Sequence, residues 1–354
     1  MTVQMGRLLL SLALCLAGFT YSAHACSAPV FRYALERWPA SHYQLLVAHQ
    51  GSLEGRSQQQ VEQLRSLIAS ANVQLRLVDL HGAPSTEDRK RVERWTKRGS
   101  FPQALLFGPE DTIDVPPLWA GFQSTEELKA LLQSPARRLL VDHLSRGASV
   151  VWLLLESSDA QADDAAAQLL AKELPRLERE IRLPTIEDPR DLLSTLPLKL
   201  SFPVLRISRE DATEAGLVRL LLQGDQAPTG PVVFPVFGRG RVLISITGKE
   251  LRPAVLERWA SYLCGPCSCQ VKELNPGFDL PLQADWDALL ALSSPASAPV
   301  LEAPAIPPGK KVASVQAPER AFSVIPVLMI AGGLVVLTAA MIAWDRWRGA
   351  RAQT

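Results

Sequence analysis

The stretch FPQALLF, from Phe101 to Phe107, places a proline directly before a short apolar run, and GPVVF, from Gly230 to Phe234, does the same further along the chain. Short runs of apolar residues bounded by turn-forming residues are typical of strands. Proline has no backbone N–H to donate and is tolerated at the start of a strand. Both stretches are therefore predicted to be strands that begin just after their proline.

Strand-like and helix-like segments alternate around the first of these stretches. Ser57, Ser85 and Ser124 each begin a capping box that is followed by apolar residues at helical spacing. The other strand-like runs in this half are 43–49, 73–80 and, as a candidate fourth strand, 112–115. The expected order of elements is β-α-β-α-β-β-α.

The second half repeats this order. Ser158 and Thr247 begin capping boxes, the second of them before a closing helix, and a further helix is expected around 217–222. A proline-bearing segment, 183–197, interrupts this half. The strand-like runs are 149–155, 198–207, 231–237 and 241–246. The repetition predicts one fold used twice.

This order, with a proline leading into the third strand, resembles the thioredoxin fold, in which that proline is cis and faces the active site. The resemblance covers residues 40–135, the first repeat, and 148–264, the second repeat. It implies an α/β protein with two tandem thioredoxin-like domains, 26–140 and 141–292, the second with a cysteine-rich extension. The family's active-site cysteines would fall at 51–56 and 157–160, and neither segment contains a cysteine.

The N-terminal residues 1–25 have the features of a secretory signal peptide. Arg7 precedes an apolar run from Leu8 to Phe19, and Ala23 and Ala25 flank His24 before the expected cleavage site. The apolar run is too short to span a bilayer, which takes about 20 residues. The mature chain is expected to begin near Cys26.

The C-terminal residues are expected to anchor the chain. Residues 322–344 are apolar and uncharged, long enough for one transmembrane helix, and the arginines that follow predict a cytoplasmic tail, 345–354. Residues 293–321 are rich in proline, alanine and serine and are expected to form an extended linker. The predicted location is the cell membrane, with a single span and the bulk of the chain outside.

The net charge of +1 and the expected export both argue against a nucleic-acid partner. The expected partners are the membrane, through one helix, and an unidentified protein of the cell envelope. No phosphate loop, His-Glu-x-x-His motif or Gly-x-Ser-x-Gly motif occurs in the sequence. No cofactor is expected.

The chain has five cysteines, and removal of the signal peptide would leave Cys26, Cys264, Cys267 and Cys269. Outside the cytoplasm these are candidates for disulfides, with three possible connectivities. The sequence Cys264-Gly265-Pro266-Cys267 matches the thioredoxin active-site motif, but it follows the closing helix of the second repeat, where the helix dipole disfavours a thiolate. We therefore expect a structural role, with Cys26 within bonding reach of at least one of the other three.

Three alternatives remain open at the sequence level. Cys264 and Cys267 could form the redox pair of an extracytoplasmic thiol–disulfide oxidoreductase. Cys264, Cys267 and Cys269 could instead bind copper or zinc as thiolates, and Cys26 could be acylated. The interpretation that the sequence favours is a membrane-anchored, non-catalytic thioredoxin-like module that binds or assembles with another envelope protein.

Overall fold

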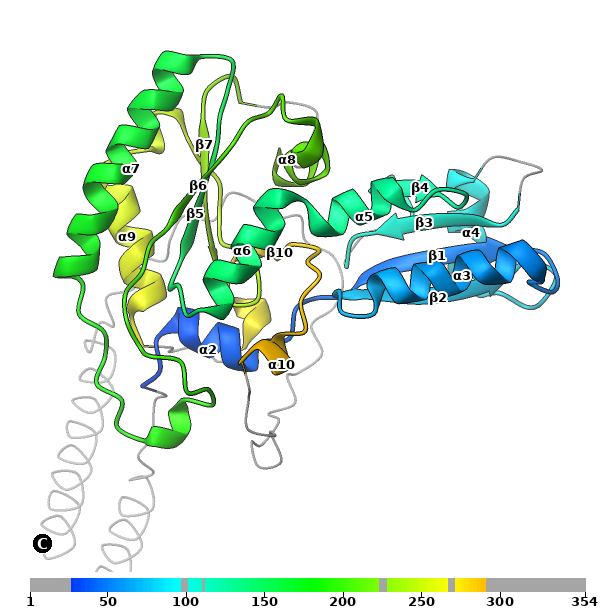
Figure 1. Cartoon of the computed structure of the whole chain (residues 1–354), viewed down its shortest axis with the longest axis horizontal. Coiled ribbons are helices and arrows are strands. Elements are labelled where there is room, and N and C mark those ends of the chain that lie inside the picture. Colours follow the sequence, from blue (N-terminus) through cyan, green and yellow to red (C-terminus); the bar gives the residue numbers. More distant parts are fainter. Residues whose placement is uncertain (1–26, 97–100, 110–111, 223–227, 267–270, 291–354) are drawn as a thin grey trace, which may run out of the picture. The chain divides into compact units, whose positions relative to one another are not determined.

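The structure is a computed structural model that describes residues 27–96, 101–109, 112–222, 228–266 and 271–290. Within this part of the chain the strands form two sheets, ordered β2-β1-β3-β4 and β10-β8-β7-β5-β6, with β9 also paired to β7 (Figure 1). None of the helices in these ranges has the length and apolar character needed to cross a membrane. The expected signal peptide, linker, transmembrane helix and tail all lie outside the described residues.

The first repeat has the expected order of elements. Its central strand, β1, pairs in parallel with β2 and antiparallel with β3, and β3 pairs antiparallel with β4. The elements are β1 (Tyr43–His49), α3 (Gly55–Ile68), β2 (Val73–Asp79), α4 (Thr86–Trp95), β3 (Gln103–Phe107), β4 (Trp119–Gly121) and α5 (Glu126–Gln133).

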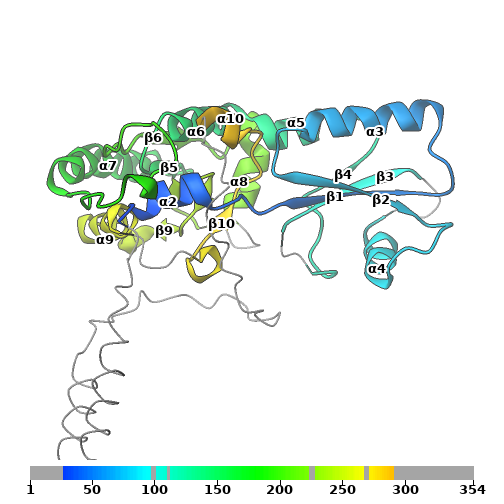
Figure 2. The same ribbon diagram turned by 90° about the horizontal axis from the view of Figure 1, so that it is seen from below.

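Both faces of this sheet are covered, because β1 carries apolar side chains on each side. Leu45 and Val47 belong to the core cluster formed with α3 and α5, whereas Leu46 and Ala48 belong to the smaller cluster formed with Val92 of α4. Figure 2 shows α3 and α5 on one side of the strands and α4 on the other. A central strand that is buried on both faces therefore shows a continuous apolar run and no alternation of apolar and polar residues.

The second repeat has the same topology. β5 pairs in parallel with β6 and antiparallel with β7, and β7 pairs with β8. The elements are β5 (Val151–Leu155), α7 (Ala160–Glu180), β6 (Val204–Ile207), α8 (Ala215–Leu222), β7 (Val232–Phe237), β8 (Arg241–Val242), β9 (Ile246–Thr247) and α9 (Pro253–Cys264). The prediction of one order of elements used twice is confirmed.

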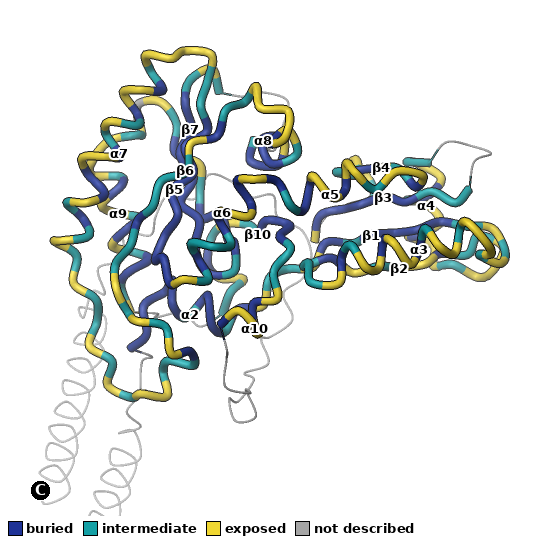
Figure 3. Tube along the Cα trace, in the orientation of Figure 1, coloured by how far each residue is buried: buried dark blue, intermediate teal, exposed yellow. Residues whose placement is uncertain are grey.

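Two apolar clusters enclose the second sheet. Trp152 and Leu154 of β5 pack with residues of α7 and α9. Val151, Leu153 and Leu155 pack with residues of α8 and of α6 (Pro135–Ser145). Figure 3 shows the buried residues concentrated in the strands, with exposed residues along the outer side of α7. Helices on both faces of each sheet give an α/β architecture.

Several elements lie outside the repeated order. α2 (Val30–Arg37) precedes the first repeat in the chain, yet its Phe31 belongs to a core cluster of the second repeat. α6 (Pro135–Ser145) joins the repeats, so the expected domain boundary at 140/141 falls inside a helix. β10 (Phe278–Asp279) and α10 (Trp286–Leu290) follow the second repeat, and the short 3-10 helices are η1 (Pro189–Asp191), η2 (Ala212–Glu214), η3 (Gly248–Glu250) and η4 (Lys272–Leu274).

The fourth strand of the first repeat was predicted in the wrong place. Residues 112–115 form a turn, with Val115 exposed, and the strand begins at Trp119 after two prolines. Proline has no N–H to contribute to a sheet, whereas Trp119 buries a large side chain in the core. Apolar composition alone did not distinguish these two short segments.

Four helix starts differ from the prediction. Two of them differ by one residue, because Thr125 and not Ser124 is the N-cap of α5, and Asp159 and not Ser158 is the N-cap of α7.

Ser85 caps α4 as expected, accepting a hydrogen bond from the Asp88 N–H, but α3 begins at Gly55, before Ser57. The closing helix α9 begins at Pro253, and Thr247 makes no side-chain cap. Proline in the first turn already has a helical φ and lacks an N–H that the helix would leave unpaired.

The two prolines that introduce the third strands have different peptide bonds. The Phe101–Pro102 bond is cis, as in the fold that the sequence resembles, whereas the Gly230–Pro231 bond is trans. The cis proline that the resemblance implies is therefore present in the first repeat, and the corresponding proline of the second repeat is trans.

Candidate functional site

Cys264 is the last residue of α9 and is fully buried. It belongs to the core cluster that includes Leu256, Ala260 and Leu263 of the same helix, and its thiol is free in the structure. Desolvation by these apolar neighbours raises the pKa of Cys264 to about 12. Since the thiolate is the nucleophilic form, this environment suppresses thiol chemistry at neutral pH.

The other three sequence-predicted cysteines, Cys26, Cys267 and Cys269, lie outside the described residues. The chain on either side of them is described, and there Pro29 forms an antiparallel bridge with Pro266. The Val30 N–H also donates to the Gly265 carbonyl at 3.0 Å. The segment that follows Cys26 therefore runs beside the segment that follows Cys264.

In the first repeat, the loop after β1 corresponds to the family's active-site position. Two histidines and a carboxylate organise it: His49 Nδ1 lies 2.8 Å from the Gly51 carbonyl oxygen, and the N–H groups of Gly51 and His81 both donate to Asp79 Oδ1 at 3.0 Å. The hydrogen bonds from His81 and Gly51 lower the pKa of Asp79. This carboxylate joins the loops that follow β1 and β2, and the site carries no thiol.

In the second repeat, the corresponding loop after β5 is closed by carboxylates of its own helix. The Ser157 N–H donates to both oxygens of Asp163 at 2.9 Å, and the Ser157 hydroxyl donates to Asp163 Oδ1 at 2.8 Å. Asp159 caps α7 by accepting the Ala162 N–H at 3.1 Å. The helix N-terminus, which stabilises a thiolate in the active fold, is occupied here by two carboxylates.

The metal alternative requires Cys264, Cys267 and Cys269 to act as thiolate ligands. Among the described residues, no group of three or more His, Cys, Asp and Glu side chains is arranged to hold a metal ion. The proposed thiolate ligands Cys267 and Cys269 lie outside those residues.

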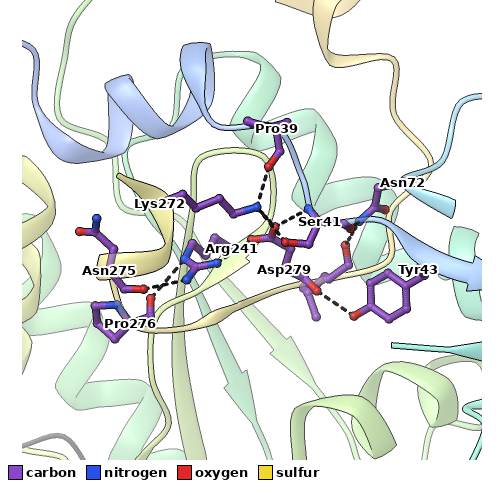
Figure 4. Close-up of polar contacts among 10 residues, drawn as sticks. Pro39, Ser41, Tyr43, Asn72, Arg241, Lys272, Asn275, Pro276 and Asp279 are labelled. Atoms are coloured by element: carbon purple, nitrogen blue, oxygen red, sulfur yellow. Dashed lines mark hydrogen bonds and ion pairs between the residues drawn. The ribbon is translucent and has the colours of Figure 1, made fainter. Parts of the chain in front are cut away.

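A buried polar cluster that the sequence did not reveal surrounds Asp279 (Figure 4). It fixes the segment 271–290, which we call the strap. Asp279 is 4% exposed and accepts hydrogen bonds from the Ser41 N–H at 2.6 Å, from Arg241 Nη1 at 3.1 Å and from Lys272 Nζ. Lys272 also donates to the Pro39 carbonyl at 2.6 Å.

The charge of Asp279 is well compensated. Burial by itself would raise the pKa of Asp279, but the charge and hydrogen bond of Lys272, the Ser41 N–H and the charge of Arg241 outweigh it, so that the pKa lies below its ordinary value. Arg241 in turn donates to the carbonyl oxygens of Asn275 at 2.8 Å and Pro276 at 3.2 Å. A buried ionised carboxylate with this many donors is stable in its position.

The strap contacts both repeats. On the second repeat, β10 pairs with β8. On the first repeat, Asn72 Nδ2 donates to the Leu280 carbonyl at 3.1 Å, Asn72 Oδ1 accepts the Leu282 N–H at 2.8 Å, and the Tyr43 hydroxyl donates to the Asp279 carbonyl at 2.8 Å. The strap is thus hydrogen-bonded to β8 of the second sheet and to residues in or next to β1 and β2 of the first sheet.

The sheet order decides what kind of fold this is. Two sheets of this order, each with helices on both faces, fit a thioredoxin-like α/β fold. No protein-family model and no curated protein matches the chain. Among solved structures it is similar to human ERp44 in its zinc-bound form, at 11% identity and a TM-score of 0.20, over 67% of this chain. The chain spans 58% of the length of that structure, and the fold assignment rests on topology instead.

Proposed function

We propose that the chain is an exported, membrane-anchored, non-catalytic thioredoxin-like module that binds or assembles with another protein of the cell envelope. The single observation that carries the non-catalytic part is that neither loop at the family's active-site position contains a cysteine: 51–56 in the first repeat and 157–160 in the second. Export and anchoring rest on the sequence of the two ends.

The environment of Cys264 supports the same proposal. A catalytic thiol needs a lowered pKa and access for its substrate. Cys264 is buried in an apolar cluster and its pKa is raised to about 12. These features suit a packing role and oppose nucleophilic attack.

The experiment is thiol mapping on the full chain purified in detergent. The protein is alkylated with and without a glutathione buffer and then digested for peptide mass analysis, and insulin reduction is measured in parallel. We expect insulin reduction to stay at the background rate, with no change in the variant C264S/C267S. Disulfides formed by the cysteines of the mature chain should resist reduction by glutathione until the chain is denatured.

The oxidoreductase alternative makes the opposite prediction. A Cys264–Cys267 pair that cycles at glutathione-like potentials, together with insulin reduction that the double variant abolishes, would replace our proposal. The metal alternative is tested on the same preparation by its content of zinc and copper, since stoichiometric metal lost in a C267S/C269S variant would favour a thiolate site.

A further inference from the structure

The first sheet ends in a long open strand. In the order β2-β1-β3-β4, the strands β2 and β4 lie at opposite edges of the sheet (Figure 1). All seven residues of β2 pair with β1, and no other strand of the described residues pairs with it. The edge strands β4, β6 and β10 have three, four and two residues. Among the described strands, β2 therefore presents the longest unpaired row of backbone groups.

A hydrogen bond at the end of β2 shows which backbone groups are unpaired. The N–H of Leu80, directly after β2, donates to the His49 carbonyl at 2.8 Å. Because backbone groups alternate in direction along a strand, the residues at even positions of β2 face β1. The N–H and C=O groups of Leu75 and Leu77 therefore point to the open side, where the described residues supply no hydrogen-bond partner for them.

The strand lacks most of the features that keep edge strands from pairing. Proteins protect such edges with prolines, bulges and outward charges, and β2 has no proline and a continuous register with β1. Its one cation, Arg76, forms an ion pair with Asp88 of α4 at 2.6 Å. Leu77 is 39% exposed, and Leu75 is half-buried. A strand added here would remove this apolar surface from water.

An extended segment already pairs with the chain just before β2. Ala71 forms an antiparallel bridge with Gln283 of the strap, and the Ala284 N–H donates to the Ser70 carbonyl at 2.7 Å. The strap pairs no further along this edge, so that 73–79 stay open. An added strand that keeps the direction of the strap is antiparallel to β2, which is the commoner arrangement in sheets.

The charge at the centre of β2 indicates which strand fits. If two copies of the chain paired antiparallel over the whole of β2, the two-fold axis would place Arg76 opposite Arg76, and like charges at opposed positions destabilise a pair of strands. The Arg76 side chain is 55% exposed, and it binds Asp88 through Nη2. Its other N–H groups are available to a carboxylate on the added strand.

We infer that the open side of β2 binds an extended segment of a partner protein as an additional antiparallel strand. The segment carries apolar side chains on the face of Leu75 and Leu77 and an acidic side chain on the face of Arg76. This inference rests on the proposed function, in which the chain binds another protein, and it names the surface and the kind of segment. In such strand addition, main-chain hydrogen bonds supply affinity and alternate side chains supply selectivity.

The first measurement is amide hydrogen exchange, residue by residue, on the full chain in detergent without a ligand. The N–H groups of Leu75 and Leu77 should exchange faster than those of Gln74 and Val78, which face β1. Equally slow exchange at all four would show that another segment of this chain or a second copy covers the edge, and would overturn the inference.

The second measurement uses a short synthetic peptide of alternating valine and threonine with glutamate at its centre. Its binding should slow exchange at Leu75 and Leu77. The same peptide with alternate nitrogens methylated should bind at least about tenfold more weakly, because main-chain donors are lost, and a peptide with lysine in place of glutamate should also bind more weakly. No binding of the glutamate peptide, or equal binding of the methylated one, would contradict strand addition.

Variants of the chain locate the binding site. L77P removes an N–H on the open side and spares the bonds to β1, and L77K keeps the backbone but adds a charge to the edge; each should weaken peptide binding at least about tenfold. The control is L139K, since Leu139 of α6 is 51% exposed. If L77P does not fold, L77K decides, and unchanged binding in a folded variant overturns the inference. None of these readouts involves a thiol, so they fail or succeed separately from the insulin assay of the proposed function.

Discussion

Cys264 is placed in a cluster of apolar side chains, and this burial makes the stability of the fold depend on the ionisation of its thiol. Its pKa rises from 9.0 to about 12 on burial, so the folded chain favours the neutral thiol. The stabilisation is present below pH 9 and is lost as the pH rises from about 9 towards 12, because the unfolded chain then loses its proton first.

The prediction is measured as an alkylation rate at Cys264. At pH 8 we expect iodoacetamide to react at least tenfold more slowly with the folded chain than with the urea-unfolded chain, since each unit of pKa changes the thiolate fraction about tenfold. Equal rates in the two states would show that the thiol is accessible and ionised, contrary to its placement.

The partner of Cys26 is a second prediction at this scale. The antiparallel bridge between Pro29 and Pro266 fixes a register. The described residues next to Cys26 therefore run beside those next to Cys267, and Cys264 itself is a free, buried thiol. We therefore expect a disulfide from Cys26 to Cys267 or Cys269 in non-reducing peptide maps.

Loss of this bond should lower the melting temperature, because a disulfide typically contributes about 2–4 kcal/mol by restricting the unfolded chain. C26S and the variant of the cysteine that the map pairs with it should have the same effect, and the double variant should add nothing further. A map in which Cys26 is unpaired, or an unchanged melting temperature in C26S, would contradict the prediction.

At the scale of elements, the strap shows what the sequence could and could not predict. The sequence offers six apolar residues as anchors of this segment, of which three are buried and Leu274 is exposed: Val271, Leu274, Phe278, Leu280, Leu282 and Trp286, the last three being the buried ones. Because these anchors are few, the sequence favours a disulfide as a further attachment. Lys272 and Asp279 are close in sequence, but their partners Ser41 and Tyr43 lie more than 200 residues earlier. Local patterns carry no information about such distant pairs.

The same reasoning separates the predicted elements from those that were missed. Central strands such as β1 and β5 were predicted because their apolar runs are continuous. The helix α2 is not predicted from the sequence. Its Arg32 and Glu36 form a buried ion pair at 2.6 Å. Glu36 accepts the N–H groups of Leu193 and Ser194 in the inserted segment, so the polar residues of this short helix serve a contact that only the folded chain creates.

A glycine at the start of β10 gives the third prediction. Gly277 has a φ of +108°, and a Cβ built on it would lie 2.0 Å from the Val242 carbonyl oxygen. G277A should therefore push the strap away from β8 and lower the free energy of unfolding by at least about 1–3 kcal/mol. The control is G230A, where an added Cβ meets nothing within 4 Å.

Denaturant titration measures both variants. If G277A unfolds at the same denaturant concentration as G230A, the strap does not pack on β8 as closely as the structure places it.

The fourth prediction concerns the contact of the strap with the first repeat. N72A removes the side chain that pairs with Leu280 and Leu282 and also donates to the Ser41 carbonyl at 2.9 Å. We expect a loss of about 1–3 kcal/mol from the groups left without a partner. Faster amide exchange at 280–284 should accompany it. Q74A is the control, since Gln74 is exposed on the neighbouring strand β2, and equal exchange in the two variants would contradict the role of Asn72.

At the scale of the whole molecule, the strap is the last described segment before the proposed linker and anchor. It hydrogen-bonds the first repeat through Asn72 and pairs with the second repeat through β10. Any connection to the membrane through residues 293–344 therefore continues from the segment that contacts both repeats.

The final prediction tests this arrangement in cells through the topology of the chain. Protease added to intact spheroplasts should cut within 293–321, because a proline-rich segment without apolar periodicity offers no packed core to protect it. The apolar segment from about Phe322 and the arginine-containing tail should remain as a protected fragment. Lysed spheroplasts are the control, in which the tail also becomes accessible. Protection of the entire chain until lysis would place the two repeats in the cytoplasm and remove the basis for a disulfide at Cys26, since thiols there are kept reduced.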